Sequence, residues 1–300
     1  MINLPATKSK IEVIDSQIHI WEENHPGRPW QADFARTRGM FLNAGPAETA
    51  ERAIAAMDAI GVDVAVLTSF LLYPDAAYEI ASIDRYPKRF ALSVQVELMD
   101  PNPADTLRRL MDRTRLVAVR LSFLDRNGHA NFALMQSANF EAWLRACAAE
   151  NIPIMIGVVG HPHLLPPVAS SHPNNVFVID HLGLPQPPTR ALPDNPFESF
   201  DDILRLSAHA NIGIKLTGAP TLSRKPFPFP DITEPITRLV KAFGKERVMW
   251  GSDFTRTRSL HDYRAALHYL TESSVFTMEE KEWLLGRAFR TFLGSRTLIK

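Results

Sequence analysis

Cysteine is almost absent from this sequence, since Cys147 is the single one among 300 residues. One thiol cannot form an internal disulfide, which excludes a fold that depends on disulfides within the chain. Cys147 lies in FEAWLRACAAE, a stretch with the apolar spacing of a helix. We therefore expect it to be a buried and unreactive thiol.

An excess of charge of either sign is also absent. Lys and Arg together number 33, as do Asp and Glu, so the formal net charge is zero. A neutral chain has no general affinity for nucleic acid or for anionic membranes. The N-terminal segment lacks the apolar core of a signal peptide, and no run approaches about 18 apolar residues. We expect a cytoplasmic protein whose partner is a small-molecule substrate, with no nucleic acid and no membrane; a homo-oligomer stays open.

Two glycine-based motifs are missing as well. No G-x-G-x-x-G follows the first β-like run, so nothing supports an open nucleotide-binding sheet. No G-x-S-x-G elbow occurs, and Cys147 lies in a helical pattern away from any strand end. Both observations argue against a covalent acyl-enzyme mechanism.

What the sequence does contain is an alternation of short apolar runs with longer helical patterns. Strands this apolar, separated by helices, indicate parallel pairing with helical crossovers. Eight repeats predict a closed (β/α)8 TIM barrel in a single domain, residues 1–300, with a barrel core at about 11–293. An open doubly wound sheet is the alternative. The eight runs are 11–15, 63–68, 90–96, 116–122, 152–158, 176–180, 212–217 and 247–251.

Three connections are long and rich in proline: residues 22–45, 185–196 and 219–233. Proline stiffens a chain without forming helix or ladder hydrogen bonds, so we expect ordered, semi-rigid loops. All three follow predicted strands, which places them on the C-terminal face of a barrel. There they would build and roof the substrate pocket.

Some helix ends are also marked in the sequence. Gly61, directly after MDAI, is suited to end a helix. The last helical pattern, residues 277–294, predicts a helix packed on the outside of the barrel. At its start, Thr277 followed by Glu280 is typical of a capping box.

Polar side chains recur at the ends of the predicted strands. An unpaired charge inside a barrel costs several kcal/mol, so such groups must pair with each other or face a wet pocket. Either way they share one location. They are Gln17 and His19 just past the first run, Arg120 and Ser122 at the end of the fourth, Asp180 and His181 at the end of the sixth, Lys215 and Thr217 at the end of the seventh, and Asp253 after the eighth.

These residue types favour hydrolysis. Asp253 is suited to act as a general base that removes a proton from water. His19 and His181 could polarise a carbonyl, and Gln17 could act as a neutral donor to the oxyanion that forms.

The basic residues indicate an anionic substrate. Arg120 could hold a carboxylate by a bidentate fork and Lys215 as a point charge. The alternative is a structural ion pair of these two side chains with Asp180 or Asp253. The predicted substrate-binding set is Gln17, Arg120, Ser122, Lys215 and, for anion recognition after the last strand, Arg256.

The strand ends IDSQIHIW, AVRLSF, VIDHLG, IKLTG and MWGSDF resemble those of the amidohydrolase-related family within the amidohydrolase superfamily. The resemblance runs over nearly the whole chain and implies a (β/α)8 barrel. Metal-dependent members carry an H-x-H pair after strand one, a His after strand five and an Asp after strand eight. Here the pair is Gln17-x-His19, Gly157 stands near the strand-five position, and only His19 and Asp253 match. Two ligands do not hold a catalytic zinc ion.

That departure makes the sequence similar to the branch of 2-pyrone-4,6-dicarboxylate lactonase and 4-sulfomuconolactone hydrolase, some of whose members hydrolyse without metal. The resemblance implies that Asp253 activates water and that His19 and His181 polarise a lactone carbonyl. It also implies that Arg120 and Lys215 grip the substrate.

Three functions follow from these observations. The first is a metal-independent hydrolase of a small anionic lactone or related cyclic carbonyl compound from aromatic or sugar catabolism, with no cofactor. The second is a metal-dependent decarboxylase or C–C bond hydrolase that holds one Zn or Mn ion, with His161 or His163 as a ligand. The third is a noncatalytic small-molecule-binding barrel.

Overall fold

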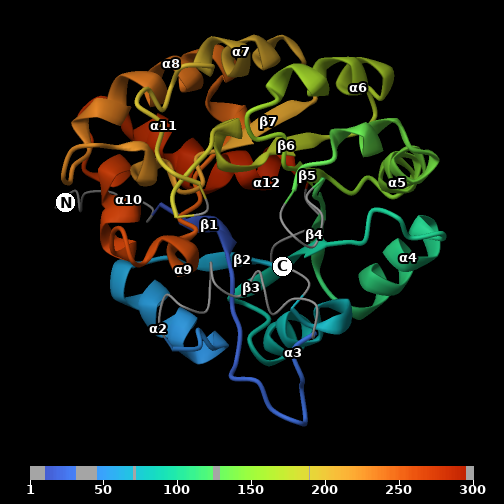
Figure 1. Ribbon diagram of the computed structural model, residues 1–300. Helices are drawn as coiled ribbons and strands as arrows, with labels where there is room; N and C mark the ends of the chain where they lie inside the picture. The colour runs from blue at the N-terminus through green and yellow to red at the C-terminus, as the bar shows by residue number, and fades with distance from the viewer. Residues whose placement is uncertain (1–10, 32–45, 70–71, 124–128, 189, 295–300) are drawn as a thin grey trace, which may run out of the picture.

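Eight parallel strands form one sheet in the computed structural model, in the order in which they occur along the chain (Figure 1). The structure describes residues 11–31, 46–69, 72–123, 129–188 and 190–294. This order is the topology of a (β/α)8 barrel, and it confirms the predicted fold. The strands are β1 (Ile14–Ile18), β2 (Val64–Thr68), β3 (Phe90–Gln95), β4 (Leu116–Leu121), β5 (Ile154–Ile156), β6 (Phe177–Ile179), β7 (Ile212–Lys215) and β8 (Val248–Met249).

An α-helix lies between every two successive strands, and the helices surround the sheet (Figure 1). This arrangement buries the outward-facing side chains of the strands under the apolar faces of the helices. The helices are α2 (Ala50–Ile60), α3 (Ala77–Arg85), α4 (Pro103–Arg113), α5 (Ala138–Ala149), α6 (Leu165–Ser171), α7 (Phe200–Arg205), α8 (Thr233–Phe243), α9 (Phe254–Thr257), α10 (Tyr263–Thr271), α11 (Met278–Glu282) and α12 (Ala288–Phe292), with a π-helical turn, η11 (Trp283–Arg287), between the last two.

The first strand begins later than the sequence predicts. Gln17 was expected just past a strand at 11–15, whereas β1 includes Gln17 and extends to Ile18. The apolar pattern misses this shift because Asp15, Ser16 and Gln17 are polar and yet fully buried. The side chains of Asp15 and Gln17 have hydrogen-bond partners inside the protein, so polarity does not mark the end of this strand. The other strands begin at or near the predicted positions.

Hydrogen bonds close the barrel where its last strand meets its first. The Ser16 amide donates to the Trp250 carbonyl at 3.2 Å, and the Asp253 amide donates to the Gln17 carbonyl at 3.0 Å. These bonds fix the segment after β8 against β1. Two residues that are far apart in the sequence, Gln17 and Asp253, are thereby held side by side.

Two apolar cores fill the fold. The larger lies between the strands and the surrounding helices, and the smaller contains inward-facing residues such as Val64 and Val66 of β2. Ala288 and Phe289 of α12 belong to this inner core. Leu284 and Leu285, in the turn just before α12, belong to the larger core. The last helical segment therefore contacts both cores, and the prediction that it packs on the outside holds for this turn but not for α12. Helical spacing shows that one face is buried but does not show against which surface.

A glycine permits this close packing of the last helical segment. A Cβ atom on Gly286, in η11, would lie 2.6 Å from the carbonyl oxygen of Glu12. No real Cβ approaches a backbone oxygen that closely, so the π-helical turn can contact the start of β1 only with glycine at this position.

Several local predictions are confirmed. Gly61 ends α2 in the left-handed conformation with φ 82°, and Thr277 and Glu280 form the expected capping box. Cys147 is a buried free thiol in α5, and burial raises its pKa to about 12. Across the described ranges, none of the helices combines the length and apolarity needed to cross a membrane.

Two of the proline-rich loops are described almost completely. In 219–233, the Arg224 amide donates to the Asp231 carboxylate at 2.7 Å, and two short 3-10 helices form, η8 (Ala219–Leu222) and η9 (Pro230–Ile232). These contacts give the loop a defined local structure. In 22–45, residues 32–45 lie outside the described residues, and so does residue 189 of 185–196. The roof over the pocket therefore stays a prediction.

Candidate active site

Seven of the nine predicted strand-end residues meet at the C-terminal ends of the strands. Side-chain hydrogen bonds and ion pairs join them into one cluster. Its members are Gln17 in β1, His19 directly after β1, Arg120 in β4, Asp180 and His181 after β6, Lys215 at the end of β7, and Asp253 after β8.

Asp253 lies at the centre of one half of this cluster. Its fully buried Oδ1 lies 3.3 Å from His19 Nε2, and its Oδ2 lies 3.8 Å from His181 Nδ1. Oδ2 also accepts a hydrogen bond from Arg256 Nε. The Asp253 backbone is left-handed, with φ 54°, and His181 shares this conformation with φ 55°. Residues with a Cβ atom adopt this conformation at a cost in free energy, and such strained residues are frequent at functional sites.

The His19 ring has a defined orientation. Its Nδ1 lies 2.6 Å from the Thr68 carbonyl oxygen, which can only accept, so Nδ1 carries a proton and donates it. The His19 amide donates to Thr255 Oγ1 at 3.0 Å, which fixes the backbone as well. Nε2 is therefore directed at Asp253 and donates to its carboxylate whenever the ring is protonated.

Gln17 connects the two halves of the cluster. Its Oε1 accepts a hydrogen bond from Lys215 Nζ at 2.6 Å, so its Nε2 is the end that faces His181 Nε2 at 3.4 Å. An amide nitrogen donates, which makes His181 Nε2 the acceptor and assigns the ring proton to Nδ1, on the side of Asp253. Gln17 thus orients His181.

Asp180 holds the two cations that the sequence assigned to substrate binding. Arg120 Nε donates to Asp180 Oδ2 at 2.7 Å, and Lys215 Nζ lies 2.6 Å from Oδ1. The structural ion pair that the sequence left as an alternative is therefore present. Lys215 is fully buried between Asp180 and Gln17, whereas the Arg120 side chain keeps 17% of its surface exposed.

The charges of the cluster follow from burial and pairing. Burial opposes ionisation of Asp253, but the guanidinium of Arg256 and the neighbouring His19 outweigh it and hold the pKa of that carboxyl well below its usual range. Lys215 and Arg120 likewise hold the pKa of Asp180 well below its usual range. Burial and the charge of Arg256 lower the pKa of His181 to about 3, so His181 is neutral at neutral pH.

A family model described as Amidohydrolase matches residues 14–293. The chain belongs to the amidohydrolase family. This confirms the resemblance carried by the strand-end motifs, and the matched region spans the whole barrel from β1 to α12. No curated protein matches this amidohydrolase.

Solved structures share its fold. A probable 2-pyrone-4,6-dicarboxylic acid hydrolase from Acinetobacter baumannii with citric acid bound is 19% identical, with a TM-score of 0.67 over 92% of this chain and 97% of that one. A zinc-bound amidohydrolase from Burkholderia multivorans is 16% identical, with a TM-score of 0.75 over 94% and 99%. The manganese-bound 5-carboxyvanillate decarboxylase of Novosphingobium aromaticivorans is 14% identical, with a TM-score of 0.64 over 95% and 98%.

Some site residues of this amidohydrolase escape sequence reasoning. Gln186 is buried in the proline-rich loop after β6, where its Nε2 donates to the carbonyls of His181 at 3.2 Å and Thr217 at 3.0 Å. Its position in a loop and its neutral side chain give no signal in the sequence. Thr68 acts through its backbone carbonyl, which every residue has, and Thr255 acts through a hydroxyl outside any motif.

Solvent reaches one side of the barrel mouth. Arg120, Ser122 and His181 are partly exposed, and so is Gly157 after β5. A Cβ atom added to Gly157 would meet no heavy atom within 4 Å, so open space lies beside it. Asp253, in contrast, is fully buried.

The His and carboxylate side chains of the site do not form a ligand set for a catalytic metal ion. Within the described ranges, no three His, Cys, Asp or Glu side chains lie close enough together to bind one. His161 and His163 are exposed after β5, where the His161 ring packs against Phe132 at 4.5 Å between centroids. His19 and Asp253 are adjacent, but the Asp253 carboxylate already accepts from Arg256.

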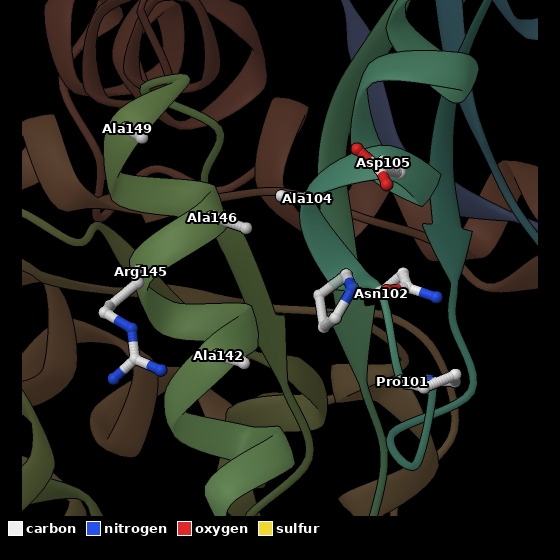
Figure 2. A pocket seen from close by; sticks show the side chains of 9 residues that line it. Pro101, Asn102, Ala104, Asp105, Ala142, Arg145, Ala146 and Ala149 are labelled. Carbon is white, nitrogen blue, oxygen red and sulfur yellow. The ribbon is translucent and has the colours of Figure 1, made fainter.

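A separate surface groove lies outside the barrel, between α4 and α5 (Figure 2). It measures about 410 Å³ and is lined mainly by alanine and proline, with Asp105 and Arg145 on opposite helices. Arg145 pairs with Glu141 and Asp105 with Arg108, each on its own helix. The groove therefore offers no cluster of reactive groups.

Proposed function

We propose that this amidohydrolase hydrolyses a small anionic lactone or a related cyclic carbonyl compound without a metal ion. The observation that carries the proposal is the position of Asp253, with His19 at 3.3 Å on one side and His181 at 3.8 Å on the other. A carboxylate between two imidazoles at the mouth of a barrel is suited to move a proton beside a carbonyl.

In the proposed reaction, water attacks the carbonyl carbon of the ring while Asp253 accepts a proton from that water. Nδ1–H of His181, which lies 3.8 Å from Asp253, is the proposed donor to the developing oxyanion. Nε2–H of protonated His19 becomes a second donor once Asp253 has taken the proton and no longer holds that N–H. The ring C–O bond then breaks, and the proton held by Asp253 passes to the leaving oxygen. The product is an open-chain hydroxy acid or its keto form.

The low pKa of Asp253 makes general-base catalysis the smaller contribution to the proposed rate enhancement. A carboxylate this strongly stabilised is a weak base. It therefore accelerates the reaction less than a carboxylate whose pKa lay near neutral pH. The larger contribution then comes from stabilising the oxyanion. The fixed charges of Lys215 and Arg256, both almost without exposure to solvent, favour a developing negative charge nearby.

Arg120 is the residue best placed to bind a substrate carboxylate. It is partly exposed at the mouth, and Ser122 lies two residues further along the same strand end. Strand neighbours two positions apart face the same side. Lys215 acts indirectly in this proposal, because its ammonium is fully buried on Asp180 and Gln17.

Assays on a panel of small lactones, with metal analysis of the purified protein, test the proposal. We expect turnover of at least one anionic lactone, and we expect it to survive exhaustive chelation. Activity that disappears on chelation and returns with Zn or Mn would favour the metal-dependent decarboxylase instead. A tightly bound carboxylic acid with no turnover of any lactone would favour the noncatalytic barrel.

A further inference from the structure

We infer that Arg256 is a built-in cation that occupies the Asp253 carboxylate and keeps divalent metal ions out of this site. The inference concerns the site of the proposed function, but it does not require the substrate to be a lactone. Its test measures metal binding, so it can fail or succeed independently of any turnover.

The guanidinium of Arg256 is fixed on all three nitrogens. Nε donates to Asp253 Oδ2, one terminal nitrogen donates to the Pro187 carbonyl at 2.6 Å, and the other donates to Gln186 Oε1 at 3.0 Å. The side chain is only 3% exposed. A planar fork with every nitrogen hydrogen-bonded has one orientation, so the positive charge beside Asp253 does not move away easily.

Two separate loops build the binding site of this guanidinium. Gln186 and Pro187 come from the proline-rich loop after β6, and Gly218 comes from the loop after β7. A Cβ atom on Gly218 would lie 2.7 Å from an Arg256 nitrogen and 2.6 Å from Gln186 Oε1. Its φ of 65° also favours glycine. The room for Arg256 is therefore part of the fold.

Two of the oxygen atoms that a metal ion could use are held by cations. Asp253 Oδ2 accepts from Arg256, and Gln17 Oε1 accepts from the buried ammonium of Lys215 at 2.6 Å. A divalent ion placed among them would meet two like charges in a poorly solvated environment, where repulsion is strong. Only His19 and Asp253 Oδ1 would remain as ligands among these residues, and two ligands do not hold a catalytic ion.

This arrangement explains how Asp253 can be an anion in a buried site without a metal. Arg256 compensates its charge and fixes Oδ2, which leaves Oδ1 directed at His19. Arg256 is in this sense a positioning residue for the carboxylate. The substrate-binding role predicted for it from the sequence is a weaker explanation, because all its nitrogens are used inside the protein.

The decisive experiment restores a third metal ligand with and without the guanidinium. Gln17→His creates His-x-His beside Asp253, which supplies three ligands and an open position. Zinc titration by calorimetry, and the visible absorption of bound cobalt, are measured for Gln17→His, Gln17→His/Arg256→Ala and Gln17→His/Arg256→Lys. Circular dichroism and thermal melting establish that each variant is folded.

We expect the Arg256→Ala double variant to bind one metal ion at least about 100-fold more tightly than Gln17→His alone. Gln17→His/Arg256→Lys, which keeps the charge, should stay weak. Adding His19→Ala to the tight variant should abolish binding and so locate the ion.

Equal affinity of Gln17→His and its Arg256→Ala derivative would overturn the inference. So would a folded Arg256→Ala double variant that binds no metal, or tight binding by the lysine variant. Stoichiometric metal at His19 and Asp253 in the wild-type protein would overturn it as well.

Discussion

Asp15 and Asp253 are two fully buried carboxylates close to the seam of the same barrel, and their surroundings differ in one respect. Among the described residues, Asp15 accepts hydrogen bonds from neutral donors: the amides of Gln17 and Ser252, the Ser252 hydroxyl, and the Tyr263 hydroxyl at 2.8 Å. Asp253 lies against the guanidinium of Arg256 and the ring of His19.

The pKa values of the two carboxyl groups are shifted in opposite directions. Burial raises the pKa of Asp15 to about 6, although four hydrogen bonds oppose the rise. Asp253 is equally buried, yet Arg256 holds its pKa well below the usual range. Neutral donors only partly replace the solvation that a carboxylate loses, whereas a cation in contact more than replaces it. In this barrel the neighbouring cation, and not the hydrogen-bond count, separates the candidate catalytic acid from the structural one.

The largest expected effect is on turnover. Asp253→Asn should lower kcat/KM for a lactone substrate by about 10²–10⁴-fold, because it removes the proton acceptor. Asp15→Asn should lower it by less than about tenfold, since Asp15 contacts the Gln17 backbone and its hydrogen bonds do not reach the side chains of Asp253, His19 or His181. Steady-state kinetics on both folded variants measure the difference. Equal losses would remove the distinction between the two acids.

The next effect is on stability as a function of pH. Asp15 has a raised folded-state pKa, so its stabilising contribution is complete below about pH 4 and is lost as the pH rises through about 6. The stability of the wild type relative to Asp15→Asn should therefore fall by about 2–3 kcal/mol between pH 4 and pH 7. Urea unfolding of both proteins across this range measures it.

Asp253 should show the opposite sign in the same measurement. Its folded-state pKa is depressed, so its contribution is present above the ordinary carboxyl range and is lost as the pH falls. The stability of the wild type relative to Asp253→Asn should rise from pH 3 to pH 5. Slopes of the same sign for the two acids would contradict the comparison.

The smallest effect concerns a single hydroxyl. Tyr263→Phe removes one donor from Asp15 and should cost about 1–2 kcal/mol of unfolding free energy at pH 7. The stacking of this ring on Phe254, at 4.0 Å between centroids, is retained. Tyr269→Phe is the matched control, because the buried Tyr269 hydroxyl has no hydrogen-bond partner among the described residues. A similar loss in both variants would show that Asp15 gains nothing specific from Tyr263.

The sequence predicted the barrel because its evidence is local. Apolar runs such as 116–122 and 212–217 report burial on both faces, and helical spacing reports one buried face. The same locality explains the errors. The predicted first strand begins too early because the buried residues of β1 are polar, and helical spacing does not reveal that α12 contacts the inner core.

For the candidate site, the sequence predicted the level in the barrel but not the pairing. His19, His181 and Asp253 come together as their strand-end positions require. The sequence identifies Arg256 as a candidate site residue. Its contact with Asp253, however, depends on hydrogen bonds from its guanidinium to Gln186 and Pro187. Both belong to a loop whose path carries no periodic signal, so nothing local could reveal the contact.

By itself, the sequence determined that this protein is an eight-stranded barrel of the amidohydrolase family with a row of polar residues at the strand ends. Only the tertiary structure decided which charge meets which: Arg256 with Asp253, and Lys215 with Asp180. The physical reason is that hydrophobic periodicity encodes the direction of a side chain, whereas ionisation depends on neighbours a few ångströms away that lie far apart along the chain.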